Sequence, residues 1–208
     1  MSVKRFMVAQ LRKPSGLFGS LVVSRLMNRA NRKIIDSTLE LLQVSPQNQV
    51  LEIGFGGGAA ISLLTKQLST GVVSGVDISA DLVRQAERRF HGEIAEGRVR
   101  VQLGDISHLP FADAVFDRVF TINTIYFWSN TLQGFGEIRR VLKNDGLAIV
   151  SLRSKETMQN YAVTKYDFRL FLPDEAADLM RQAGFLHVRV EQRHQGKVFN
   201  EVLVVGVR

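Results

Sequence analysis

The stretch Val50-Leu51-Glu52-Ile53-Gly54-Phe55-Gly56-Gly57-Gly58-Ala59 decides how this 208-residue chain is expected to fold. Its first four residues are typical of a buried strand, and the glycines that follow predict a tight loop leading into a helix. Glycine adopts positive φ without steric cost and leaves no Cβ between backbone N–H groups and a ligand. The start of the following helix directs its amides and partial positive charge to the same place. The stretch therefore predicts a site for a small ligand.

The glycine loop alone does not identify that ligand. Its spacing, Gly54-x-Gly56-x-x-Ala59, also satisfies the fingerprint of dinucleotide-binding loops. The choice between a dinucleotide and another ligand therefore depends on the residues around the loop.

Strands and helices are expected to alternate along most of the chain. The expected strands are 50–53, 72–76, 99–103, 116–121 and 147–152, and the expected helices are 34–42, 61–68, 82–90, 132–142 and 173–183. Alternation with continuous apolar strands indicates a parallel sheet covered on both faces. Two further extended runs, 186–191 and 202–207, lie close enough in sequence to predict an antiparallel hairpin. We expect an α/β fold: a Rossmann-like, doubly wound, mostly parallel seven-stranded sheet with an antiparallel C-terminal edge pair.

The net charge of +7 is concentrated at the start of the chain. Residues 1–35 contain eight Lys and Arg and no carboxylate, whereas the remainder carries 19 basic and 20 acidic residues. We therefore divide the chain into a basic N-terminal accessory or lid segment, 1–33, and a domain formed by 34–208. An anionic or lipid-like partner, including peripheral contact with a membrane surface, is expected at the basic segment.

Composition excludes several classes of site. The chain has no cysteine, which rules out disulfides, thiolate zinc sites, iron–sulfur clusters and cysteine nucleophiles, and its four scattered histidines predict no metal site. The best apolar run, Leu17 to Val23, is too short to span a membrane, and no small-residue cleavage site follows it. We expect a cytoplasmic protein.

Polar residues end three successive strands, at the edge where open α/β sheets bind ligands. Besides the glycine loop these are Asp77 and Asp105. Asp77 is placed to accept hydrogen bonds from ribose hydroxyls, and Asp105-Ile106 offers an acceptor and an apolar wall to a purine with an exocyclic amine. Capping of the next helix is the alternative role for either aspartate.

In four ordered motifs the chain resembles the class I S-adenosylmethionine-dependent methyltransferases. Residues 50–58 resemble the first motif of that family, Gly75-Val76-Asp77-Ile78-Ser79 its acidic second-strand motif, and Gly104-Asp105-Ile106 its adenine-side motif. Residues 109–119 resemble the stretch before the fourth strand in the subgroup of quinone-biosynthesis and other small-molecule methyltransferases. The resemblance covers about residues 34–152.

This resemblance implies S-adenosylmethionine as the cofactor. Glu52 would anchor the loop and the ammonium side, Asp77 would bind the ribose hydroxyls, and Asp105 would bind the adenine amine. The remaining implied contacts are Gly54, Gly56 and Gly58 along the amino-acid and ribose portions, Ile78 and Ile106 around the adenine ring, and Asn123 near the sulfonium methyl.

The implied reaction is a direct displacement, in which a lone pair of the acceptor attacks the methyl carbon in line with the departing sulfur. Positioning in a dry pocket supplies much of the acceleration, and a base is needed only for a protonated nucleophile. The sequence names no base. Asn123, Tyr126 and Trp128 are candidates to line the acceptor pocket. The expected acceptor is a small-molecule or lipid-like compound with an N, O or C nucleophile.

The segment Asn123-Thr124-Ile125-Tyr126 lacks the two prolines that the methyltransferases of base amines carry at this place. Their absence disfavours a nucleic-acid substrate.

Two other functions remain open from the residues alone. Tyr161-x-x-x-Lys165 has the catalytic spacing of short-chain NAD(P)-dependent oxidoreductases, although a serine partner is not evident and the glycine spacing differs. A non-catalytic cofactor-binding protein of the same fold is the second alternative.

Overall fold

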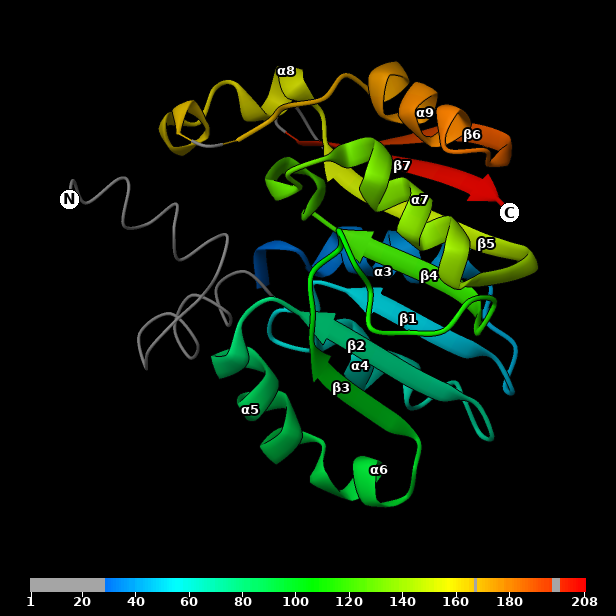
Figure 1. Ribbon diagram of the computed structural model, residues 1–208. Helices are drawn as coiled ribbons and strands as arrows, with labels where there is room; N and C mark the ends of the chain where they lie inside the picture. The colour runs from blue at the N-terminus through cyan, green and yellow to red at the C-terminus, as the bar shows by residue number, and fades with distance from the viewer. Residues whose placement is uncertain (1–28, 167, 196–198) are drawn as a thin grey trace.

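In the computed structural model, which describes residues 29–166, 168–195 and 199–208, seven strands form one sheet (Figure 1). Their order across the sheet is β3-β2-β1-β4-β5-β7-β6. The parallel strands are β1 (Gln49–Ile53), β2 (Val72–Asp77), β3 (Val99–Leu103), β4 (Phe116–Ile122) and β5 (Leu142–Arg153). β7 (Phe199–Val207) is antiparallel to both β5 and β6 (Leu186–Gln195). The expected mostly parallel sheet with an antiparallel C-terminal pair is confirmed.

The order of the strands reverses at β1, which pairs with β2 on one side and with β4 on the other. Both neighbours run parallel to β1, so the carboxyl ends of the three strands meet at one edge of the sheet. In open α/β sheets this switch point is where ligands bind. The topology therefore brings the glycine loop, the end of β2 and the end of β4 together.

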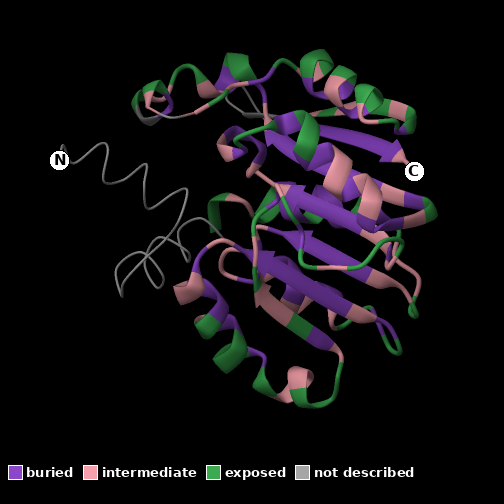
Figure 2. Cartoon of the chain, viewed as in Figure 1, coloured by how far each residue is buried: buried purple, intermediate pink, exposed green. Residues whose placement is uncertain are grey.

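Helices cover both faces of the sheet. One face packs against α3 (Arg32–Leu42), α4 (Ala59–Leu64) and α5 (Ala80–Arg89), and the other against α7 (Thr131–Val141) and α9 (Pro173–Gln182). The shorter elements are α6 (His91–Ala95), α8 (Lys155–Met158) and the 3-10 turns η2 (Ile125–Phe127) and η3 (Ala162–Lys165). Successive strand residues point to opposite faces, so Ile149 joins one apolar cluster and Val150 the other. The strands are accordingly buried along most of their length (Figure 2).

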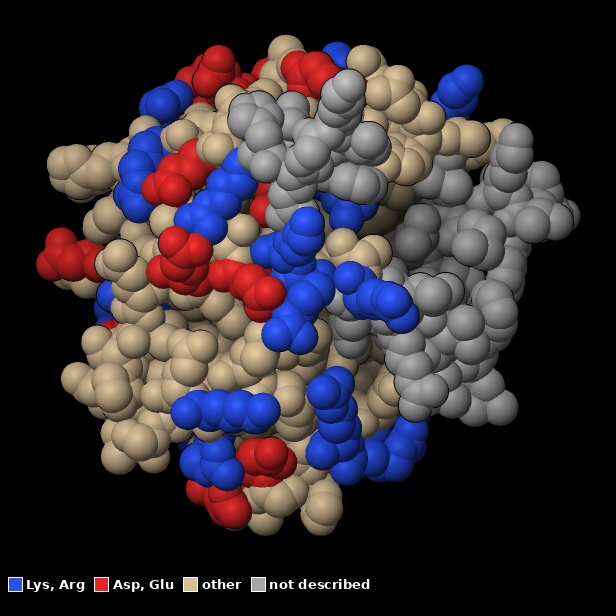
Figure 3. Space-filling view, turned by 180° about the vertical axis from the view of Figure 1, so that it is seen from behind, with Lys and Arg blue, Asp and Glu red and all other residues tan. Residues whose placement is uncertain are grey.

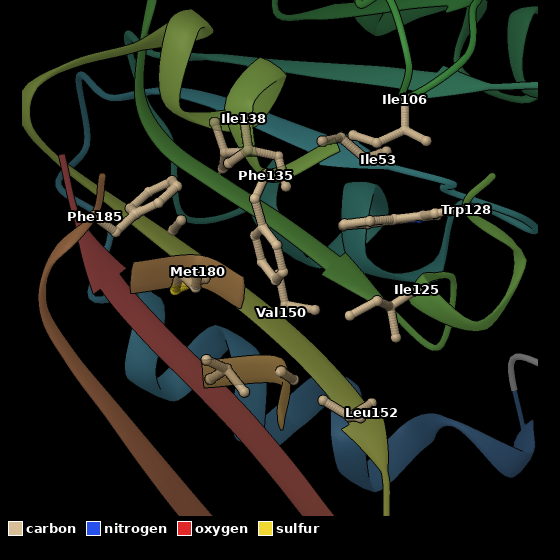
Figure 4. Close-up of a cluster of buried hydrophobic side chains, with 14 of the residues drawn as sticks. Ile53, Ile106, Ile125, Trp128, Phe135, Ile138, Val150, Leu152, Met180 and Phe185 are labelled. Carbon is tan, nitrogen blue, oxygen red and sulfur yellow. The ribbon is translucent and has the colours of Figure 1, made fainter. Parts of the chain in front are cut away.

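One apolar cluster reaches the edge of the sheet where the switch point lies. Trp128 lies among Ile53, Ile106 and Ile125 (Figure 4), and its ring meets Phe135 edge to face at 5.6 Å. A Cβ on Gly134 would come within 2.8 Å of the Trp128 ring. The glycine in α7 therefore makes room for this aromatic side chain next to the switch point.

The main differences from the expected elements are at two boundaries. The helix expected over 61–68 is shorter, because the N–H groups of Lys66 and Gln67 donate to carbonyls three residues back and tighten the last turn. β5 begins at Leu142, directly after α7, and its pairing with β4 shifts in register before Leu147. Apolar residues stay buried beyond the end of α4 and ahead of the register shift in β5. The hydrophobic pattern therefore does not mark either boundary.

The expected division of the chain after residue 33 stays a prediction. α3 begins at Arg32, and most of the basic segment lies outside the described residues. Within the described ranges, no helix has both the length and the apolar character needed to cross a membrane.

Candidate functional site

A cavity opens at the carboxyl ends of β1, β2 and β4, where the topology predicts a ligand site. Most of the residues predicted for the site lie along its wall: Glu52, Gly54, Gly56, Asp77, Ile78, Asp105, Ile106, Asn123 and Trp128. Two predicted residues, Gly58 and Tyr126, are not part of the wall that the described residues form.

The three glycines of the loop all have positive φ, between 53° and 72°, but serve different purposes. A Cβ on Gly54 would come within 2.5 Å of the Thr124 side chain, and one on Gly58 within 2.8 Å of the Phe90 ring. A Cβ on Gly56 would meet nothing within 4 Å. Gly56 therefore leaves the cavity open and Gly54 allows the close approach of Thr124, whereas Gly58, expected beside a cofactor, packs against Phe90 just before α4.

Glu52 presents a buried carboxyl to this cavity. The side chain is on the last but one residue of β1, and the residue is 5% exposed. Its Oε2 atom has no hydrogen-bond partner within the described part of the chain. Burial raises the pKa of this carboxyl well above its usual range, and the negative charge of Asp77 adds to the shift. An orphaned buried acceptor of this kind suits a ligand that brings a cationic donor.

Asp77 connects the end of β2 to the glycine loop. Its Oδ2 accepts from the backbone N–H of Gly56 at 3.1 Å, and its Oδ1 from that of Ser79 at 2.9 Å. Ser79, rather than Asp77, caps α5 by accepting from the N–H of Leu82. Burial raises the pKa of Asp77, against the opposing effect of its hydrogen bonds. The carboxylate is thus held in one orientation on the cavity wall.

Asp105 lies farther along the same edge. Its Oδ1 accepts from both the N–H and the hydroxyl of Ser107, at 2.8 and 2.6 Å. This local turn fixes the direction of the side chain at the rim of the cavity. The next residue, Ile106, is buried and contributes an apolar part of the wall, as expected.

Asn123 directly follows β4 and has the left-handed conformation, with φ of 57°. Its backbone N–H donates to the Ser151 carbonyl at 2.8 Å. Its side-chain Nδ2 donates to Oδ1 of Asn31 at 3.1 Å, and its own Oδ1 accepts from the Tyr126 hydroxyl at 3.2 Å. The amide is therefore held from both sides where it lines the cavity.

The aromatic side chains of η2 differ from the expected arrangement. Tyr126 is buried, and its hydroxyl accepts from the N–H of Arg153 at 2.6 Å. Burial raises the pKa of Tyr126, so the phenol keeps its proton. Phe127 lines the cavity in its place and packs against Phe168, with ring centroids 4.7 Å apart. Trp128 also lines the cavity, and its Nε1 donates to the Thr124 hydroxyl at 3.1 Å.

Several lining residues were not singled out from the sequence. These are Asn31, Ile35, Thr124 and Phe127. Thr124 and Phe127 are neighbours of predicted residues, and only the turn of η2 decides which of them face the cavity. Asn31 and Ile35 come from α3 and the residue before it, more than eighty residues from Asn123, and no local pattern could have identified them.

The pair expected of a short-chain oxidoreductase lies elsewhere. Tyr161 and Lys165 bound the short turn η3 and do not line the cavity that the described residues form. The structure gives no support to the oxidoreductase alternative.

Comparison with known proteins agrees with the geometry. Residues 51–150 match a family model described as a methyltransferase domain. The chain is 30% identical to the provisionally named methyltransferase YrhH of Bacillus subtilis, over 62% of this chain and 68% of that protein. It is 31% identical to a malonyl-[acyl-carrier protein] O-methyltransferase of Geobacter sulfurreducens, over 76% of this chain and 64% of that protein. The chain thus spans less than two thirds of the second relative.

Solved structures show the same fold. A chain in the complex of the Haloferax volcanii Trm112 methyltransferase activator with a methyltransferase superposes with a TM-score of 0.79 at 20% identity, over 91% of this chain and 95% of that one. An S-adenosylmethionine-dependent methyltransferase from Aquifex aeolicus gives a TM-score of 0.67 at 21% identity, over 82% and 88% of the two chains. Together with the sequence matches and the switch-point cavity, these show that the chain belongs to the class I S-adenosylmethionine-dependent methyltransferases, with S-adenosylmethionine as its cofactor.

Proposed function

We propose that the protein transfers the methyl group of S-adenosylmethionine to a small-molecule or lipid-like acceptor that enters beside Asn123, Phe127 and Trp128. The observation that carries the proposal is the separation of charge along the cavity wall. Its three carboxyl groups, on Glu52, Asp77 and Asp105, all lie on the β1–β3 side. The opposite side is formed by amide, hydroxyl and apolar side chains.

The carboxyl side fits the cofactor. We propose that Glu52 binds the ammonium group, because its orphaned oxygen needs a cationic donor. Asp77 would accept from the ribose hydroxyls and Asp105 from the adenine amine. Glycine and apolar contacts would come from Gly54 and Gly56 at the loop and from Ile78 and Ile106 around the adenine ring, and Asn123 would offer a polar contact near the sulfonium. The bound cofactor supplies a methyl group attached to a positively charged sulfur.

The acceptor side offers no base among the described residues. The wall there consists of Asn31, Ile35, Ile122, Asn123, Thr124, Phe127 and Trp128. Tyr126 lies behind this wall with a raised pKa and keeps its proton. An acceptor that reaches the site already deprotonated fits such a wall: a carboxylate, or an amine that is neutral at the working pH. The chain's role in the transfer is then to orient this nucleophile and to exclude water.

An anionic acceptor is favoured by charge. The eight basic residues of 1–35 form the strongest concentration of one sign in the sequence. On the back of the domain, some Lys and Arg side chains have acidic neighbours (Figure 3), and exposed Arg32 and partly buried Arg193 pair with Asp36 and Glu40. The O-methyltransferase relatives are named for a malonyl group on a carrier protein. An acyl carboxylate is therefore the first acceptor to test.

We further propose that the protein is cytoplasmic and that its residues 1–33 form a lid and a basic surface that contacts anionic partners. The test is sedimentation of the full-length protein with vesicles of neutral or of partly anionic lipids. Binding confined to the anionic vesicles, and lost at high salt, supports a peripheral membrane contact. If the same fraction of the protein stays in the supernatant with neutral and with anionic vesicles, the proposed membrane contact is contradicted.

The function is tested first by binding and then by turnover. Calorimetry should show tight binding of S-adenosylhomocysteine and none of NADH, and the reverse result would contradict the assignment. The full-length protein is then incubated with methyl-labelled S-adenosylmethionine and a panel of acyl carboxylates, malonyl-carrier protein, amines and lipids. Transfer to a carboxylate or amine supports the proposal. Transfer that occurs only to unactivated hydroxyls would require a base and would contradict the proposed role of the acceptor wall.

A further inference from the structure

We propose that Asn31 is a positioning residue for methyl transfer, which holds the side-chain amide of Asn123 on the cavity wall and connects it to Arg153. The inference rests on the proposed function and adds a residue that precedes the 51–150 region matched by the methyltransferase family model. It concerns how this chain orients its acceptor side.

The first observation is that Asn31 does not perform the local role typical of its position. It is the residue before α3, where an asparagine side chain normally accepts from an N–H of the first turn. Asn31 makes no such bond. By contrast, Asn130 at the start of α7 accepts from the N–H of Gln133 at 3.1 Å. The backbone explains the difference: Asn31 has φ of −96° and ψ of 1° and follows two helical residues, whereas Asn130 is extended, so the Asn31 side chain is not placed to cap α3 and is available for other contacts.

The second observation is where the Asn31 side chain goes. Its Oδ1 accepts from Nδ2 of Asn123 at 3.1 Å and from Nη2 of Arg153 at 3.4 Å. The same guanidinium nitrogen donates to the Ala30 carbonyl at 3.1 Å. Asn31 is also part of the cavity wall. One oxygen therefore connects the start of α3 to the ends of β4 and β5.

The third observation is that these contacts close a ring. The Tyr126 hydroxyl accepts from the backbone N–H of Arg153 at 2.6 Å, and its single proton has two acceptors within reach, the Arg153 carbonyl at 3.0 Å and Oδ1 of Asn123 at 3.2 Å. Asn31, Asn123, Tyr126 and Arg153 are thus joined in a cycle of hydrogen bonds. In this cycle Asn123 shares the Tyr126 hydroxyl with the Arg153 carbonyl, whereas its Nδ2 group donates to Asn31, so the contact with Asn31 is the one that defines the orientation of the amide.

The ring also accounts for the backbone of Asn123. Its positive φ is an uncommon conformation that surrounding contacts must maintain, and such residues concentrate at functional sites. Removing the hydrogen-bond acceptor on Asn31 would release the Nδ2 end of the Asn123 amide. The amide would then be free to rotate at the place where the substrate that receives the methyl group is expected to bind. A small displacement of this kind lowers the rate of a reaction that depends on alignment.

The test follows the Asn123 amide directly, in full-length protein labelled with 15N-asparagine and without any ligand. Its side-chain resonances are identified by their loss in Asn123→Ser. In Asn31→Leu, which keeps the shape and removes the acceptor, the amide protons should shift toward free-amide positions and exchange faster with water. Asn31→Asp, which keeps an acceptor oxygen, should retain the wild-type shift. Asn31→Ser replaces Asn31→Leu if the latter does not fold.

Asn130→Ala is the matched control. It removes an asparagine that does cap its helix, so it should lower Tm and leave the Asn123 resonances unchanged. A role for Asn31 in α3 stability alone predicts the same result for Asn31→Leu. Unchanged Asn123 resonances in Asn31→Leu, or a loss of the wild-type shift in Asn31→Asp, would overturn the inference.

Turnover gives the second measurement. With an acceptor found in the screen above, Asn31→Leu should lower kcat roughly tenfold while KM for S-adenosylmethionine stays within about threefold, and Asn31→Asp should restore most of kcat. An unchanged kcat in Asn31→Leu contradicts the positioning role. If the wild-type protein methylates nothing in the panel, the proposed function fails, and the amide resonances still decide whether Asn31 holds Asn123.

Discussion

Replacing Glu52 by Gln should stabilise the free protein and weaken its hold on the cofactor. Glu52 is almost fully buried, and one of its carboxyl oxygens has no partner in the described chain. Burial raises its pKa from the ordinary value of 4.5, and Asp77 adds to the shift. Glutamine has nearly the same shape without the titratable charge. The substitution therefore removes the cost of burying a negative charge at this position.

The change in stability with pH follows from the linkage between proton binding and folding. Because the pKa is raised on folding, the contribution of Glu52 to stability is fully present below about pH 4.5 and is lost as the pH rises through the folded-state value. Over that range each pH unit costs the wild type about 1.4 kcal/mol that the Gln variant does not lose. For a protein of this size the Tm difference should grow by roughly 3–5 °C per pH unit.

The assay is thermal unfolding of both proteins, followed by circular dichroism between about pH 5 and pH 8. Calorimetry with S-adenosylhomocysteine then measures the second effect. A lost charge-assisted hydrogen bond contributes about 1.5–3 kcal/mol, so affinity should fall roughly 10- to 100-fold. Glu201→Gln is a matched control, since Glu201 is also buried with a raised pKa but accepts from Ser37 away from the cavity.

Two results would refute this reasoning about Glu52. The first is a Tm difference between Glu52→Gln and wild type that stays constant with pH. The second is an unchanged affinity for S-adenosylhomocysteine in Glu52→Gln, or an equal loss in Glu201→Gln. The first would show that folding does not raise the pKa of Glu52, and the second that its orphaned oxygen does not face the ammonium group.

Four further substitutions test the cavity and the glycine loop beside it. Asp77→Ala removes the acceptor that holds the Gly56 N–H, and we expect loss of S-adenosylhomocysteine binding by calorimetry with an unchanged circular dichroism spectrum; wild-type affinity would count against its role. Gly56 and Gly58 both have positive φ, so alanine at either position should lower Tm through a loss of roughly 1 kcal/mol of stability. Gly58→Ala should lower Tm further because its Cβ would meet the Phe90 ring at 2.8 Å, whereas Gly56→Ala should cause the larger loss of S-adenosylhomocysteine affinity; a larger Tm loss in Gly56→Ala, or a larger affinity loss in Gly58→Ala, would contradict these placements. Phe127→Ala should raise the KM of the acceptor and leave the KM of S-adenosylmethionine nearly unchanged. A change in the KM of S-adenosylmethionine alone would place Phe127 on the cofactor side of the cavity and contradict its proposed role.

The fold was predictable because its signals are local. Apolar runs bounded by glycine and aspartate define β1 and β2, and the positive φ of Gly54, Gly56 and Gly58 explains why those positions are glycine. The residues along β1–β3 that face the cavity follow from the rule that ligands bind beyond the carboxyl ends of parallel strands.

The acceptor side was less predictable for two physical reasons. In the three-residue turn η2 no period exists from which to infer direction, so Tyr126 was expected on the wall where Phe127 lies. The partner of Asn123 is 92 residues away in sequence, and only the packed fold brings Asn31 to it. Contacts between distant polar side chains leave no trace in a hydrophobic pattern.

The contrast between a locally encoded cofactor side and an acceptor side built from distant residues indicates which residues determine acceptor specificity. The proposed cofactor contacts, from Glu52 to Asn123, all lie within the 51–150 region that matches the general methyltransferase model. The side chains that support the acceptor wall come from outside it: Asn31 accepts from Asn123 and is itself bound by Arg153, and Phe168 packs behind Phe127. Since one cofactor serves the whole family, the shared region can stay the same while these supporting residues change. Exchange of the segments that carry them should therefore alter the acceptor and preserve cofactor affinity.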